Sequence, residues 1–551
     1  MCPYAANCVG SNNETALHSM LDIQVYTDDD IKALLACTKA ETLLVKDNNG
    51  KGDPVFFKAF VKGKNVLNNR SKLILEANPN VLFIPSRNHG NKMLLDWAMK
   101  KNDINLVEVF CRLCPKIAED SDELLNLPIH NACERENTPL EIIQAIFRAY
   151  PGCLSVKDKD GNTPLHSAVE TLSGNTVEQV VNMFLGESTK CAEIQDKDGN
   201  MALHSACECR KPSSKVILRL IQANPKALEK RDKERNLPLH SALELGDVIQ
   251  PDVIKVMIDT YPGAVKIKDK EKNTPLHSAV ENMRKFASAV VDMLLKADPG
   301  NYAVKQRDEE GNLAIHSACE HPRPTNDVIL KLIEHYPDCL KQKDKDGNLA
   351  IHSACENNEP NDKVILKMME LYPGSLKTKD KDGNLAIHSL SENTKQMENR
   401  DKVILTMIDL NPDSLRQKDK DGNTPLHSFI ENPSQINNRE KVIGVMVKEY
   451  EGALAEKDRD GNLPIHSALA QGKKISIEGI KALLVNRESL LKPNPRGNIP
   501  FHQAFNMAGK KLDDKAHAIL YLNPSVLLMK KSECFGRSLY FLNFAINKKT
   551  Y

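Results

Sequence analysis

One arrangement of apolar and polar positions recurs along the chain. Within residues 343–377 it begins with the polar stretch KDKDGN, continues with LAIHSACE, and crosses a polar loop to reach KVILKMMELY. The spacing of apolar residues in the first segment, such as Leu165 and Ala168 in an equivalent copy, predicts a short helix with one apolar side. The second segment is apolar around most of its circumference, which predicts a helix packed between neighbours. Pro373 ends this second helix, because the residue before a proline is disfavoured in the α region.

Each short helix follows a turn whose residue types specify its backbone. The sequence Asp-x-Asp-Gly-Asn places a glycine, such as Gly161, where a positive φ is needed. Thr163 then occupies the N-cap and Pro164 the first helical position, where a missing N–H costs nothing. After the second helix, a Pro-x-x-apolar ending returns an apolar side chain beneath the array, as Leu376 does after Pro373. One such unit leaves its apolar faces uncovered, so the units must stack.

A histidine marks the same position of the short helix in most copies, at intervals of 36 to 39 residues. These histidines are His130, His166, His204, His240, His277, His316, His352, His388, His427, His466 and His502. Weaker copies continue the spacing outward, with His18, Phe57, Asp96 and Phe541 in the histidine position. The sequence therefore predicts about fifteen units. They leave no segment long enough for a separate catalytic domain.

The regularity of the copies divides the chain into three parts. Residues 1–125 are predicted to hold degenerate units, residues 126–505 the regular array, and residues 506–551 a C-terminal capping unit. Degenerate ends are expected, because terminal units face solvent on one side instead of a neighbour. The predicted fold class is an all-α repeat solenoid of stacked helix-turn-helix units with short β-turn or hairpin tips.

The order of turn, T-P-L-H-x-A, helix, loop and helix resembles the ankyrin repeat (ANK repeat). T-P-L-H occurs at 163–166, 274–277 and 424–427, and the D-x-x-G element before it also matches, as at 158–161. The resemblance covers essentially the whole chain. It implies a curved solenoid in which turn tips and first helices line a concave face that usually binds proteins. The signature residues, for which we predict a structural role, are Gly161, Thr163, Pro164, Leu165, His166, His204, His240, Thr274, Pro275, His277, His316, Gly347, His352, His388, Gly422, Thr424, Pro425, His427 and His466.

The chain departs from the ankyrin pattern in two ways. Its period exceeds the roughly 33 residues of an ankyrin repeat, and we place part of the surplus in the inter-helix loops, longest at 391–401 and 431–440. Lengthening a surface loop costs little closure entropy. Leu, Met or Ile often replaces the threonine before the histidine, as at Leu349, so the Thr-to-His hydrogen bond that the resemblance implies cannot form there. We expect backbone carbonyls alone to hold such a histidine, and Asn348 or its equivalents to cap the helix.

Composition and charge exclude several classes of function. The 75 basic and 74 acidic residues give a net charge of +1, which provides no overall attraction to nucleic acid or an anionic membrane. No window supplies the roughly 20 uncharged apolar residues of a membrane span, and residues 1–13 lack the pattern of a secretory signal. We therefore expect a cytoplasmic or nuclear protein, whose 14 cysteines are mostly buried thiols.

Two repeated residue types could carry chemistry. A glutamate follows several histidines by four residues, as in His352 and Glu356, and such a pair shares a helix face that could bind a metal or transfer protons. Near-identical pairs in many copies instead favour a structural role, in which the imidazole links adjacent units. Cysteines such as Cys133 occupy a position that is apolar in other copies, so we predict them to lie in the core. The pair Cys111-x-x-Cys114 lacks a second pair of ligands, which disfavours zinc.

Other motifs give no support for an active site. Aligning Gly161 with the invariant glycine of a calcium loop puts Val156 and Ser167 where carboxylates are required. The sequence contains no phosphate loop, nucleophile elbow, kinase motif set or H-E-x-x-H. We predict no catalytic residue, cofactor or metal. The leading hypothesis is a protein-protein interaction scaffold or adaptor that binds a protein partner of unknown identity. The alternatives are a metal- or ligand-responsive regulatory protein that uses the His/Glu pairs or cysteines, and an enzyme of unrecognised type.

Overall fold

The chain folds as repeated helix pairs in two compact units. The computed structural model describes residues 6–10, 14–22, 26–46, 55–62, 68–84, 94–432, 436–507, 513–524 and 526. The units are Met1–Ala264 and Val265–Tyr551, and the described residues of each form seven helix pairs. The described residues contain helices and turns but no strand longer than an isolated bridge. The predicted all-α repeat fold is confirmed.

In the first unit a short first helix alternates with a longer second helix. The first helices are α2 (Ala16–Asp22), α5 (Val55–Lys62), α7 (Leu94–Lys100), α9 (Pro128–Cys133), α11 (Pro164–Thr171), α13 (Ala202–Glu208) and α15 (Pro238–Glu244). The second helices are α3 (Asp28–Leu35), α6 (Asn69–Ala77), α8 (Ile104–Leu113), α10 (Leu140–Ala149), α12 (Gly174–Glu187), α14 (Ser214–Ala223) and α16 (Pro251–Thr260).

The second unit repeats this order. Its first helices are α17 (Pro275–Asn282), α19 (Ala314–Glu320), α21 (Ala350–Glu356), α23 (Ala386–Glu392), α25 (Pro425–Glu431), α27 (Pro464–Ala470) and α29 (Pro500–Met507). Its second helices are α18 (Ala287–Ala297), α20 (Asn326–His335), α22 (Asp362–Leu371), α24 (Arg400–Leu410), α26 (Arg439–Glu449), α28 (Ile477–Leu483) and α30 (Asp514–Leu522).

The pair α21 and α22 illustrates why the sequence adopts these elements. Residues 350–355 of α21 are all buried, so this helix packs on every side except near its C-terminal end. Asn361 caps α22 by accepting a hydrogen bond from the Val364 N–H at 3.1 Å. The helix ends at Leu371, just before Tyr372 and Pro373, and a single 3₁₀ turn, η12 (Pro373–Lys377), follows and buries Leu376. The proline stop and the returning apolar residue predicted from the sequence are therefore both present.

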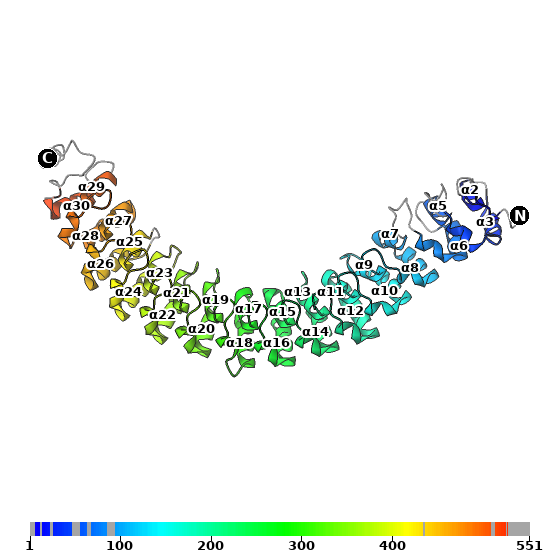
Figure 1. The fold of residues 1–551 in the computed structure, drawn as a ribbon, viewed down its shortest axis with the longest axis horizontal. Coiled ribbons are helices and arrows are strands. Elements are labelled where there is room, and N and C mark those ends of the chain that lie inside the picture. The colour runs from blue at the N-terminus through cyan, green and yellow to red at the C-terminus, as the bar shows by residue number, and fades with distance from the viewer. Residues whose placement is uncertain are drawn as a thin grey trace. The chain divides into compact units, whose positions relative to one another are not determined.

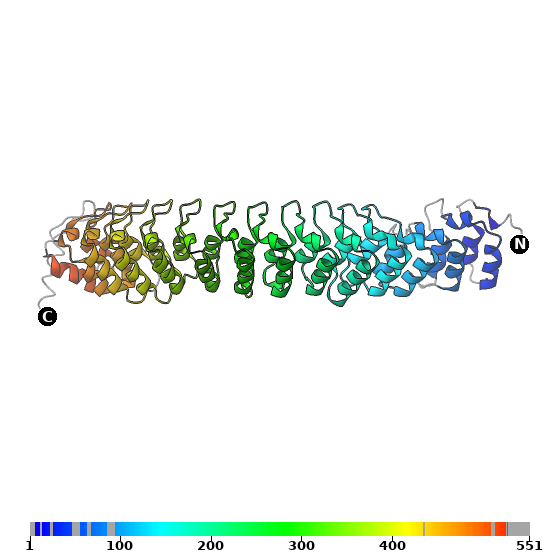
Figure 2. The same cartoon turned by 90° about the horizontal axis from the view of Figure 1, so that it is seen from below.

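Within each unit, the first helices form one row and the second helices form another (Figure 1). The turns that precede the first helices project along one edge of these rows (Figure 2). We call these turns the tips; each comprises the five or six residues before the first helix, such as 157–162. The tip closes on itself, because the Asp158 N–H donates to the Asn162 carbonyl at 2.9 Å. The rows thus place the tips and the first helices on a common surface within each unit.

The surplus length over an ankyrin repeat lies partly in the inter-helix loops, as predicted, but those loops are shorter than expected. Residues 391–392 belong to α23 and residues 400–401 to α24, so the predicted loop 391–401 contracts to 393–399. Arg400 stabilises the short form of this loop. The residue is 3% exposed, and its guanidinium donates to the carbonyls of Asn393 and Lys395. Elsewhere the surplus lies in a helix, since α12 has 14 residues.

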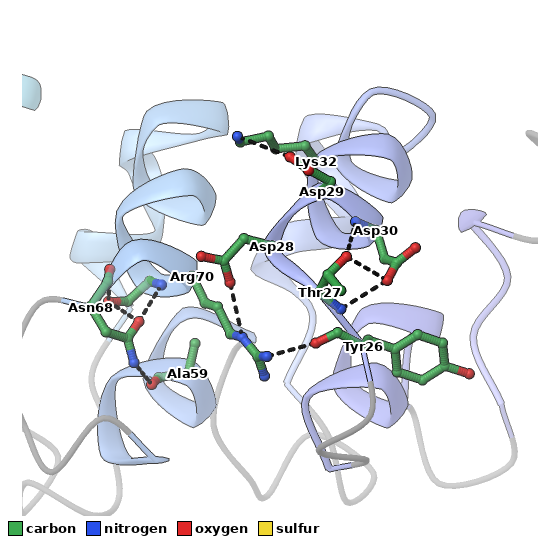
Figure 3. A network of polar contacts seen from close by, with 10 residues as sticks. Tyr26, Thr27, Asp28, Asp29, Asp30, Lys32, Ala59, Asn68 and Arg70 are labelled. Atoms are coloured by element: carbon green, nitrogen blue, oxygen red, sulfur yellow. Dashed lines mark hydrogen bonds and ion pairs between the residues drawn. The ribbon is translucent and has the colours of Figure 1, made fainter.

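The N-terminal copies form helix pairs despite their weak motifs. Thr27 caps α3, and its own N–H donates to the Asp30 carboxylate at 2.8 Å. Arg70 on α6 joins the two helix pairs, because its Nε donates to Asp28 at 3.2 Å and its Nη2 to the Tyr26 carbonyl at 2.7 Å (Figure 3). The side chain of Phe57 and all of Phe541 lie outside the described residues. In the part of the chain that is described, no helix has the length and apolar character needed to cross a membrane.

Candidate interaction surface

In seven first helices the histidine is a buried structural link. In α11, Nδ1 of His166 accepts from the Thr163 N–H at 3.2 Å and lies 2.8 Å from the Thr163 hydroxyl. Its Nε2 lies 3.2 Å from the Asn200 carbonyl of the following copy. Because a backbone N–H points at Nδ1, the proton is assigned to Nε2, which donates to that carbonyl. His204, His277 and His466 make the same link to the last residue of the following tip, whereas His316, His352 and His388 bond the residue just before that tip.

Copies that lack the threonine hold the histidine differently from our expectation. Nδ1 of His352 accepts from the Leu349 N–H at 3.1 Å, while its Nε2 donates to the Thr378 carbonyl at 3.1 Å. The prediction that carbonyls alone hold this histidine was wrong, because the N-cap residue offers its backbone N–H whatever its side chain. Asn348 does not cap α21 either, since its side chain donates to Asp344 at 3.1 Å inside the tip.

Burial keeps these imidazoles neutral. His166, His240, His277, His352, His388 and His427 are all 0% exposed. Desolvation lowers the pKa of His204, His277, His388, His427 and His466 to about 4. A neutral imidazole with both nitrogens directed at backbone groups is poorly placed to transfer protons.

The His/Glu pairs do not form sites. Five of these glutamates instead turn toward the following copy, where each accepts a hydrogen bond from the serine that follows the next histidine. Ser353 donates to Glu320 at 3.1 Å and Ser389 donates to Glu356 at 2.8 Å. Equivalent bonds join Ser241 to Glu208, Ser428 to Glu392 and Ser467 to Glu431. The histidine and the glutamate lie on one face of their helix, as their spacing predicted, but the glutamate bonds a serine of the next first helix.

The described residues contain no group of three or more His, Cys, Asp or Glu side chains that could hold a metal ion. The described cysteines are free, and most of them are buried. Burial raises the pKa of Cys111 to about 12 and also raises that of Cys114, so neither presents a thiolate at neutral pH. The arrangement gives no support to the regulatory alternative that relies on His/Glu pairs or thiols.

The tips are joined to one another by a chain of paired charges. In five tips the third residue is a lysine or arginine, and its side chain forms an ion pair with the acidic fourth residue of the preceding tip. Lys381 contacts Asp346 at 2.8 Å, and the equivalent pairs are Lys233–Asp198, Lys345–Glu310, Lys420–Asp382 and Arg459–Asp421. A backbone hydrogen bond joins the same two residues, since the Lys381 N–H donates to the Asp346 carbonyl at 2.9 Å. The signature glycines Gly161, Gly347 and Gly422 lie in these tips with φ of +87°, +80° and +79°.

Pairing within the tips leaves the glutamates of the first helices as the main repeated charge on this surface. Apart from Glu244 of α15, which has the same position in its helix, we call seven of them the glutamate row: Glu170 and Glu208 in the first unit, and Glu281, Glu320, Glu356, Glu392 and Glu431 in the second. Partial enclosure between helices raises the pKa of each, and neighbouring acidic side chains raise it further. For Glu320 the pKa rises to about 7.

Sequence reasoning missed the glutamate row as a surface feature. It treated each glutamate as a possible partner of its own histidine, because the two lie on one helical face. The regular serine after the histidine, in the repeated H-S-A, was the available indication of a different partner.

The chain was compared with protein families, curated proteins and solved structures. No protein-family model and no curated protein matches the chain. Among solved structures, one match is the ankyrin repeat domain of Bcl-3, described as a unique member of the IkappaB protein family. It shares 21% identity, covers 45% of this chain and 99% of that chain, and superposes with a TM-score of 0.34. We therefore base the ankyrin-like description on the repeated helix pairs, tips and T-P-L-H contacts of this chain itself.

Proposed function

We propose that the chain is a non-enzymatic protein-interaction scaffold, and that a protein partner binds the surface formed by the tips and the first helices. The observation that supports this proposal is that buried residues and exposed residues have different roles within each copy. The repeated residues, such as His352, are buried and bonded to backbone groups. The exposed tip reads KDKDGN at 157–162, 343–348, 379–384 and 418–423, but it differs in other copies, as at Leu124 and Leu125 or at Glu309 and Glu310. Exposed residues that differ between some copies of a repeated, buried frame support selective recognition of a partner.

Site-specific photo-crosslinking in the native cell tests this proposal. A photoreactive residue at Asp460, an exposed position in a tip, is expected to capture a protein partner. The matched control carries the same residue at Lys448, an exposed position on the second helix α26. Specific adducts at Lys448 with none at Asp460, or none at either position, would argue against binding on the tip and first-helix surface.

A further inference from the structure

The charge pairing of the tips breaks at two steps in the second unit, at Pro495 and at Glu309, and only Glu309 replaces the cation with an acid. The third residue of the tip at 307–312 is Glu309, where the equivalent tips carry Lys345, Lys381 or Lys420. Its N–H donates to the Glu271 carbonyl at 2.9 Å, so the backbone hydrogen bond between the two consecutive tips is present. The residue opposite is therefore Glu271, whose carboxylate accepts a hydrogen bond from Asn273 at 3.4 Å, so this step has two acids and no tip cation between them. Like charges at this step repel and favour a cation from outside the chain.

A hollow of about 500 Å³ opens beside this step. Its acidic lining consists of Glu271, Glu281, Asp308, Glu309, Glu310 and Glu320. Among these, Glu310 pairs with Lys345 at 3.2 Å. Three nearby cations are engaged by backbone carbonyls. Arg307 donates to Lys343 and Lys268 donates to Arg307, while Arg284 donates to Met283 and Glu281 at the edge of the hollow. His321, the remaining titratable group of the lining, contacts Arg284 and has a pKa lowered by burial, so it adds no positive charge.

The hollow also contains a buried serine hydroxyl, which distinguishes it from a surface cluster of acidic side chains. Ser317 lines it and is 6% exposed, yet its hydroxyl has no hydrogen-bond partner among the described residues. The equivalent Ser353 donates to Glu320 at 3.1 Å. Ser317 lies near enough to Glu281 to oppose the rise in its pKa, but the contact falls outside hydrogen-bond geometry. A buried hydroxyl without a partner costs free energy that a bound polar group would recover.

We propose that this hollow receives an arginine side chain from a basic segment of the protein partner. The guanidinium would replace the missing tip cation between Glu271 and Glu309, while its remaining donors face Glu281 and the Ser317 hydroxyl. Arginine fits better than lysine, because its planar group offers five donors and pairs with carboxylates in bidentate fashion. The inference deepens the proposed function and rests on it.

Peptide binding tests the proposal with the full chain. The probe is a fluorescent nonapeptide with one central arginine among Gly and Ser, compared with the same peptide carrying citrulline, which keeps the shape and removes the charge. The arginine peptide is expected to bind at least tenfold more tightly by anisotropy. Glu309→Lys, which restores the Lys–acid step of the other tips, should weaken its binding at least tenfold. Glu281→Gln, which keeps the side-chain size, should also weaken it.

The matched control is Glu334→Lys, which makes the same change of charge on α20, in the other row of helices. It should change the affinity less than twofold. Equal losses in Glu309→Lys and Glu334→Lys, or equal binding of the arginine and citrulline peptides, would overturn the arginine site. So would stoichiometric binding of CaCl₂ alone that Glu309→Lys abolishes. None of these results would remove crosslinking at Asp460, so the two proposals fail separately.

Discussion

At the scale of single residues, Leu125 has a backbone conformation that glycine adopts in most other tips. Its φ is +60°, and its N–H donates to the Asp122 carbonyl at 3.0 Å, as the Gly161 N–H does to Asp158 at 3.1 Å. A left-handed conformation costs a residue with a Cβ about 1–2 kcal/mol. The Leu125 side chain is also 55% exposed, so burial offsets little of that cost.

We therefore expect Leu125→Gly to stabilise the first unit by about 1 kcal/mol. The gain arises because glycine adopts this φ without strain, and few buried contacts are lost. Urea denaturation followed by circular dichroism measures it. Leu124→Gly is the control, since Leu124 is 52% exposed and is not among the residues with positive φ. A loss of stability in Leu125→Gly would contradict the assignment of strain to this position.

The histidines show what residue types alone could predict. Burial and a link between copies followed from the repetition of His166 and its equivalents. The acceptor of that link did not, because it is a backbone carbonyl whose position depends on how the next copy stacks. In α11 that acceptor is Asn200, 34 residues away, and in α21 it is Thr378, 26 residues away.

At the scale of elements, buried asparagines at the ends of first helices tie each copy to the one before it. Asn393 follows α23, is 9% exposed, and donates to the carbonyls of Cys355 at 2.7 Å and Asn357 at 2.8 Å. Asn357 and Asn432 make equivalent pairs of bonds. The carbonyls they satisfy lie at or just beyond the C-terminal end of the preceding first helix, where intrahelical partners run out.

Replacing Asn393 with leucine should destabilise the neighbouring copies by about 2–3 kcal/mol, because two buried carbonyls lose their donors. Hydrogen exchange read by mass spectrometry should show faster exchange in α21 and α23 than in α27. Thr394→Leu changes an exposed residue of the same loop and should leave exchange unchanged. Equal exchange in both variants would mean that the asparagine bonds contribute little.

The elements were predictable because each depends on local chemistry. Proline stops, turn glycines and apolar spacing specified the helix pairs, and the structure contains them. The loop 391–401 was less predictable, because Arg400 reads as an exposed charged residue. Its burial against backbone carbonyls of its own loop lengthens the helix and shortens the loop.

At the scale of the molecule, the histidines dominate the expected dependence of stability on pH. Five of them have a folded-state pKa of about 4 against an ordinary value of 6.5. Between these values the unfolded chain binds more protons than the folded chain, so stability falls as pH falls. The raised pKa of Glu320, about 7, acts in the opposite sense between pH 7 and 4.5. That contribution to stability is smaller, because the Glu320 side chain is only partly enclosed and solvent screens its carboxyl.

The urea midpoint should consequently be lower at pH 5 than at pH 7.5. Each histidine contributes on the order of 1–2 kcal/mol to this loss. Equilibrium denaturation at the two pH values measures it, and proton uptake on unfolding at pH 5 provides a second readout. A midpoint that rises on acidification would mean that the glutamate row outweighs the histidines.

Net charge gave a misleading view of the whole surface. The sum of +1 is nearly neutral, and within the tips the charges do pair. In the second unit, the glutamate row and the two acids Glu271 and Glu309 concentrate negative charge along the first helices and one pair of tips. Only the stacking of copies reveals this, because residues 38 positions apart in the sequence become neighbours there.

The histidine links also have a direction, because each of the seven linked imidazoles donates to a carbonyl later in the chain, in the next tip or just before it. His352 finds its acceptor 26 residues later and His277 finds its acceptor 35 residues later. During synthesis on the ribosome, a newly emerged copy therefore holds a buried N–H without an acceptor until the next tip has been translated. Folding should then advance behind the ribosome with a lag of about one copy, and a stalled nascent chain should be protease-sensitive in its last copy.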